Sequence, residues 1–173
     1  LGGDISSPLI LQNLDRENGT ISSMSTTFVL DKRNNRMETT GGHYLSLSEE
    51  FAGIGGNREF VRSILNMRYY KKIWGDLVFR NKLEGGNLYD YTGRGVQSNE
   101  RFYLGGANSL RGYADFQVGP FRGDFGDNRI YPTGGLNQFH YMAELEYPLV
   151  RDIGLKGVLF YDAGDAFNKL NQV

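Results

Sequence analysis

The sequence contains no cysteine, only four prolines, only two histidines and no long apolar run. The absence of cysteine excludes a disulfide scaffold, a cysteine nucleophile and a cysteine-ligated zinc site. No segment approaches the roughly 18 apolar residues of a membrane-spanning helix. Lys and Arg number 19 against 20 Asp and Glu, and this balance provides no basic surface for nucleic acid. We therefore expect no metal, no cofactor and no nucleic-acid partner.

Glycine and two aromatic residue types are abundant instead. The 24 glycines in 173 residues are about twice the usual share of roughly 7%, and 11 Tyr and 11 Phe accompany a single Trp. Apolar residues recur at every second position, which is typical of β-strands. In segment 136–149, for example, Phe139 and Tyr141 flank the polar His140. The pattern predicts an all-β chain without amphipathic helices, and its six strands lie at about 21–31, 42–53, 60–73, 76–91, 136–149 and 154–167.

The length of these strands favours a membrane barrel. They run to roughly 10–14 residues, about twice the mode of about 5–6 for soluble sheets. A strand tilted by about 45° needs about 9–11 residues to cross the hydrocarbon of a bilayer. Aromatic residues near strand ends (Tyr69, Trp74 and Tyr147) favour the same interpretation. A soluble β-sandwich module gives the same alternation and is the alternative.

The connections between the strands form two groups. The links near 32–41, 73–75 and 150–153 are modest or short and would share one side of the sheet, whereas the long loop at about 92–135 lies on the other. This asymmetry is typical of outer-membrane barrels. Such barrels need an even number of strands, at least about eight, because lipid does not tolerate open sheet edges. We therefore interpret 1–173 as an incomplete part of a single transmembrane β-barrel domain.

The long loop also contains the most distinctive motif. Segment 102–113 reads Phe-Tyr-Leu-Gly-Gly-Ala-Asn-Ser-Leu-Arg-Gly-Tyr, and Gly119 and Pro120 follow it. These residues resemble the loop-six motif of the BamA-like outer-membrane barrel-assembly family, also called the bacterial surface antigen or β-barrel insertase superfamily. That motif reads roughly FxxGGxxSVRGF, followed by GP.

Three further segments resemble the same family in the same order. Residues 31–42 resemble its DxRxN…PTxG periplasmic turn, although Thr39 stands where the family has proline. Residues 134–149 resemble its GGN…ELxxPL strand, and 159–164 resemble its FxDAG strand. Four motifs in order make a specific match to the superfamily.

The resemblance implies a barrel of about sixteen strands preceded by POTRA domains. This chain would hold about six of those strands and the extracellular loop six, which folds into the lumen, while the POTRA domains and closing strands are absent from it. The implied activity is the folding and insertion of β-barrel proteins into the bacterial outer membrane, without enzymatic chemistry. The implied partners are unfolded outer-membrane proteins, accessory outer-membrane lipoproteins and the lipid bilayer.

Arg111 is the residue on which the candidate site depends. Its guanidinium offers a planar fork for carboxylates and stays charged, and its glycine neighbours allow unusual backbone conformations. In the family the equivalent arginine packs loop six against the inner wall through carboxylates that match Glu144 and Asp162 here. A solvated loop arginine and ordinary lumen-lining acids are the alternatives. The loop-six motif positions are Gly105, Gly106, Ser109, Leu110, Arg111, Gly112 and Tyr113.

Other functions within the same superfamily stay open at this point. Leu110 and Tyr113 replace the Val and Phe of VRGF, and RGY-type loops also resemble those of TamA-like translocation-assembly proteins and two-partner secretion pores. A hydrolase with an attached barrel is a third possibility, but no serine or cysteine nucleophile is evidently paired with His140.

Overall fold

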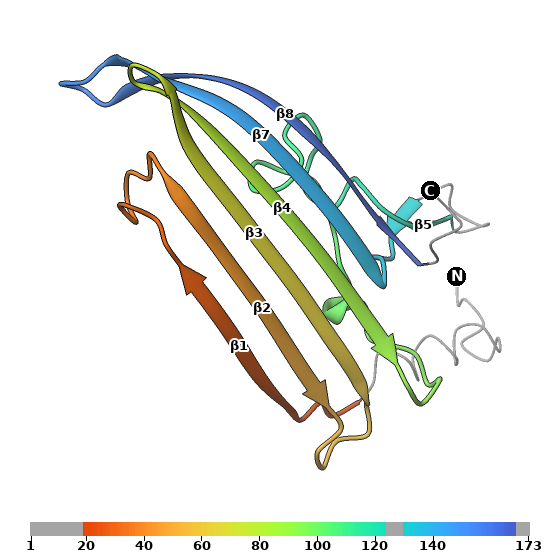
Figure 1. The fold of residues 1–173 in the computed structure, drawn as a ribbon. Helices are drawn as coiled ribbons and strands as arrows, with labels where there is room; N and C mark the ends of the chain where they lie inside the picture. Colours follow the sequence, from red (N-terminus) through yellow and green to blue (C-terminus); the bar gives the residue numbers. More distant parts are fainter. Residues whose placement is uncertain (1–18, 124–129, 169–173) are drawn as a thin grey trace.

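The computed structural model describes residues 19–123 and 130–168 and has one main antiparallel sheet. Its strand order is β1-β2-β3-β4-β7-β8, and β1 and β8 form its two edges in the described part of the chain (Figure 1). No helix among the described residues is long and apolar enough to cross a membrane. The six strands are β1 (Ser23–Asp31), β2 (Gly42–Ala52), β3 (Phe60–Trp74), β4 (Leu77–Asp90), β7 (Asn137–Val150) and β8 (Leu155–Phe167).

The outer face of the sheet is apolar because side chains alternate along each strand and the register aligns like residues. Phe28, Leu47 and Leu65 are direct neighbours across β1, β2 and β3. The Phe28 side chain is 67% exposed, and most of the other large apolar residues on this face are exposed as well. An exposed apolar surface of this breadth is typical of a membrane or partner interface rather than of a free soluble surface.

A polar row crosses this apolar face near the end that carries the long loop. The Ser63 Oγ donates a hydrogen bond of 2.6 Å to Glu49 Oε2, and Asn87 Nδ2 donates one of 2.7 Å to Asn137 Oδ1. Polar groups on a lipid-facing surface are costly at the bilayer midplane and tolerated near the interfaces. The row consists of Thr26, Glu49, Ser63, Asn87 and Asn137, which are paired in register.

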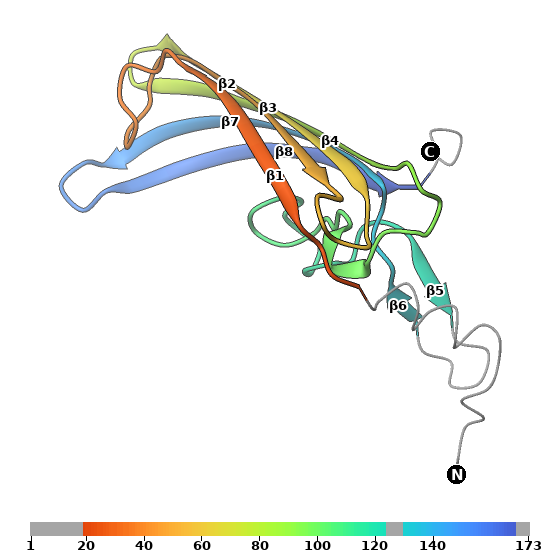
Figure 2. The same cartoon turned by 90° about the horizontal axis from the view of Figure 1, so that it is seen from below.

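The connection between β4 and β7 lies against the concave face of the sheet (Figure 2). It contains a 3₁₀ turn, Ser98–Glu100, and a small separate sheet of β5 (Phe121–Gly123) and β6 (Ile130–Pro132). The sequence pattern predicts no secondary structure in 92–135, and in this respect it is wrong. Strands of three residues are too short to show a period of two.

The buried core lies between the loop and the end of the sheet from which the loop emerges. Phe102 and Leu104 from the loop pack with Phe60 and Leu88 from the strands. A Cβ atom built on Gly86 of β4 would lie 2.7 Å from Phe102 Cζ, so glycine makes room for the ring. The loop is therefore an integral layer of the fold that covers part of the inner face.

The polar row predicts the depth at which the outer face meets the bilayer. We expect it to lie at the outer boundary of the hydrocarbon. Nitroxide labels at Ser63→Cys and Leu65→Cys in the full-length protein in bilayers measure this depth through collisions with oxygen and with a nickel chelate. Nickel collisions should dominate at position 63 and oxygen collisions at position 65. Oxygen-dominated collisions at both positions would contradict the assignment.

Candidate functional site

The tip of the long loop, residues 104–118, is closed by its own hydrogen bonds. The Val118 N–H donates to the Leu104 carbonyl at 3.1 Å, and the Leu104 N–H donates back at 3.4 Å. Within the tip, Ser109 Oγ accepts a hydrogen bond from the Gly105 N–H at 2.9 Å and donates to the Gly105 carbonyl at 2.8 Å. The predicted motif residue Ser109 thus holds the turn that precedes Arg111.

Glycine is required where this tip folds back on itself. Gly105 has a φ of +121°, and a Cβ atom there would lie 2.2 Å from the Ala114 carbonyl oxygen. Gly106 and Gly112 also have positive φ angles, of +86° and +94°, and residues other than glycine rarely adopt such angles. The Gly106 N–H donates to the Tyr113 carbonyl at 2.9 Å, whereas the Tyr113 side chain is exposed.

Arg111 is brought together with both predicted carboxylates. Its Nε and Nη2 donate to the two Asp162 oxygens at 2.7 and 2.6 Å, and its backbone N–H donates to Asp162 Oδ2 at 3.1 Å. Its Nη1 donates to Glu144 Oε1 at 2.5 Å. The guanidinium carbon also lies 3.7 Å from the centre of the Phe160 ring, within the range of a cation–π contact. We call this cluster the Arg111 anchor.

The register of β7 and β8 places the two carboxylates within reach of one guanidinium. Glu144 is opposite Phe160, and Asp162 follows two residues along the same inner face of β8. The Asp162 side chain is only 4% exposed, against 16% for Glu144 and 24% for Arg111. The hydrogen bonds to Asp162, reinforced by Glu144, raise the pKa of Arg111 above its usual value, so the guanidinium stays protonated.

Two residues near the anchor are buried, one in the loop and one on the wall. Leu110, a predicted motif residue, is part of the core. His140 lies on the inner face of β7, where it is 1% exposed, and its Nε2 has no hydrogen-bond partner among the described residues. Its burial follows from the position of the loop, which the alternation along β7 cannot reveal.

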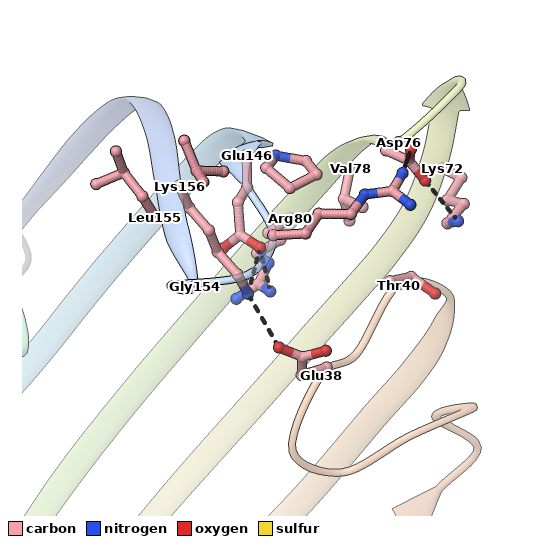
Figure 3. A pocket seen from close by; sticks show the side chains of 13 residues that line it. Glu38, Thr40, Lys72, Asp76, Val78, Arg80, Glu146, Gly154, Leu155 and Lys156 are labelled. Atoms are coloured by element: carbon pink, nitrogen blue, oxygen red, sulfur yellow. Dashed lines mark hydrogen bonds and ion pairs between the residues drawn. The ribbon is translucent and has the colours of Figure 1, made fainter.

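A pocket of about 260 Å³ lies at the opposite end of the inner face, near the short turns (Figure 3). Glu38, from the turn between β1 and β2, reaches Lys156 on β8, with 3.6 Å between the charged atoms. Lys156 and Arg80 both pair with Glu146, at 3.1 and 2.9 Å. No group of three or more His, Asp or Glu residues in 19–123 and 130–168 is arranged to hold a metal ion. These paired charges share the pocket lining with apolar side chains such as Val78.

An antiparallel wall that is apolar outside and carries an anchored loop inside defines a transmembrane β-barrel protein. Residues 4–173 match the Omp85 superfamily domain, and the chain belongs to that superfamily. The fold class inferred from the sequence is thereby confirmed.

Several curated proteins are similar to this chain. It is 34% identical over 120 residues to the sorting and assembly machinery component 50 homolog of Bos taurus, a match that covers 68% of the chain and 26% of that protein. It is 29% identical over 153 residues to the outer membrane protein assembly factor BamA of Nitratidesulfovibrio vulgaris, which covers 87% of the chain and 19% of that protein. The chain therefore spans about a quarter or less of the length of these relatives.

A solved structure supports the same fold. The crystal structure of BamA from Haemophilus ducreyi lacking POTRA domains 1-3 superposes with a TM-score of 0.76. The two chains are 19% identical, and the match covers 84% of this chain and 30% of the other. The two chains therefore share a fold although their sequence identity is low.

The Arg111 anchor predicts that the loop becomes accessible when the guanidinium is removed. Losing charge-assisted hydrogen bonds costs about 1.5–3 kcal/mol, so proteinase K should cleave the loop of an Arg111→Gln full-length protein roughly tenfold faster or more. Arg80→Gln is the matched control, because Arg80 hydrogen-bonds to Glu146 on the wall. Equal cleavage rates in the two variants would refute the anchor.

The glycine geometry predicts an order of damage within the loop. Gly105→Ala forces a Cβ atom against a backbone carbonyl, whereas Gly112→Ala places one in open space at a similarly positive φ. Backbone strain alone costs about 1–2 kcal/mol, so we expect Gly105→Ala to expose the loop to protease more than Gly112→Ala. If both substitutions have the same effect, close packing of the tip does not matter.

Proposed function

We propose that this chain is part of an outer-membrane protein assembly factor that folds β-barrel proteins and inserts them into the membrane. The observation that carries the proposal is the Arg111 anchor, which seats a long loop on the inner wall of an Omp85 barrel. The names of both groups of relatives, sorting and assembly machinery component 50 and outer membrane protein assembly factor, support assembly rather than secretion. They do not favour the two-partner secretion or TamA-like alternative.

The proposed mechanism is physical and involves no covalent chemistry. An incoming chain gains backbone hydrogen bonds by adding to an exposed strand edge, which acts as a template. In this proposal the described strands supply a stable wall, and the anchored loop fills the inner face beside β7 and β8. The template edge would belong to strands other than the interior pairs seen here, because each interior strand already has two partners.

The proposed partners follow from the same function. They are unfolded outer-membrane proteins, accessory outer-membrane lipoproteins and the lipid bilayer, which the exposed apolar outer face would contact. The proposed location is the bacterial outer membrane. Similar proteins occur in Homo sapiens as well as in bacteria, so membership of the superfamily does not by itself assign a bacterial source.

The proposal predicts a broad assembly defect when the loop is released. In a bacterial host depleted of the endogenous full-length protein, the Arg111→Gln variant should restore many outer-membrane proteins poorly, and the wild type and Arg80→Gln should restore them well. Quantitative proteomics of the outer membrane measures this. Loss of a single secreted protein, with normal levels of the other barrels, would instead identify a dedicated secretion pore.

A further inference from the structure

A second arginine contacts the long loop from the same inner face of the sheet, on the other side of β4. Arg62 lies on β3, and its Nη2 donates a hydrogen bond of 2.7 Å to the backbone carbonyl of Glu100 in the 3₁₀ turn of the loop. The same Nη2 also contacts the Glu100 carboxylate. Its Nη1 donates to Glu50 Oε2 on β2 at 3.0 Å. One guanidinium therefore joins the loop to two strands of the wall.

The surroundings of Arg62 distinguish this contact from an ordinary surface ion pair. The Arg62 side chain is 19% exposed, and its guanidinium lies 5.4 Å from the centre of the Phe60 ring. Glu50 also accepts a hydrogen bond of 2.6 Å from Ser23 Oγ on β1. Exposed pairs contribute little to stability, whereas forked, partly buried and stacked arginines hold their partners in one geometry.

The two loop contacts have opposite polarity. At the Arg111 anchor the loop supplies the cation and the wall supplies the carboxylates, whereas at Arg62 the wall supplies the cation and the loop supplies Glu100. The contacts lie on β3 and on the β7–β8 pair, with β4 between them in the sheet. The loop thus crosses the inner face of the arched sheet, as Figure 2 shows, and is held on both sides of β4.

We propose that Arg62 and Glu100 form a second, independent anchor that positions the start of the long loop. The loop then acts as a brace that joins β3 to the β7–β8 pair across the inner face. Of the two arginines on this face of β3, only Arg62 hydrogen-bonds to the loop. Arg68, three lumen-facing positions further along β3, instead donates to Asn66 Oδ1 at 3.1 Å and stacks on Tyr44.

Hydrogen–deuterium exchange of the full-length protein in membranes tests the second anchor. In Arg62→Gln we expect amides of segment 96–104 to exchange at least about tenfold faster, as for the loss of a charge-assisted hydrogen bond. Segment 108–114, held by the Arg111 anchor, should stay close to wild type. Arg111→Gln should give the reverse pattern. Two separable responses are the signature of two anchors.

Two further variants keep the test decisive if Arg62→Gln disturbs the wall. Glu100→Gln changes only the loop partner and should accelerate the same segment 96–104, and the Arg62→Gln/Glu100→Gln double variant should be no worse than Arg62→Gln. Arg68→Gln, the matched control on the same face of β3, should leave both segments unchanged. The proposal is overturned if Arg62→Gln and Arg68→Gln behave alike, or if Arg62→Gln releases 108–114 as strongly as Arg111→Gln does.

Discussion

The structure depends on the pairing of one loop cation with two wall carboxylates. Asp162 is almost fully covered, and a covered carboxylate is unfavourable unless a positive charge and hydrogen bonds compensate for it. Arg111 supplies both, and Glu144 and the Phe160 ring complete its surroundings. The loop and the wall therefore stabilise each other, because neither the acid nor the arginine is well accommodated alone.

This constraint explains the arrangement of the rest of the inner face. The loop can place Arg111 on the wall only if its tip folds tightly, which Gly105 and its neighbours permit, and only if its apolar residues find a buried surface. The end of the inner face nearest the long loop provides that surface, whereas the end near the short turns carries paired charges. The outer face needs no such cover if lipid occupies it. In the proposed function, a braced wall of this kind would keep its shape while barrel strands elsewhere receive a substrate.

Much of the wall and of the Arg111 anchor could be predicted from the sequence. Alternation along each strand identifies its position, and a resemblance to a family motif pointed to Arg111, Glu144 and Asp162. The second anchor could not be found in this way, because Arg62 and Glu100 are 38 residues apart and lie outside the recognised motifs. The polar row on the outer face and the burial of His140 also depend on register and loop position, which a single sequence does not specify.

The most direct test of the central claim is a double-mutant cycle between Arg111 and Asp162. It compares the free energy of loop opening, from hydrogen exchange of segment 108–114 in the full-length protein, for Arg111→Gln, Asp162→Asn and both together. If the two residues act as one anchor, the double variant should open little more readily than either single variant. Strictly additive effects would show that Arg111 and Asp162 act separately and would contradict the account.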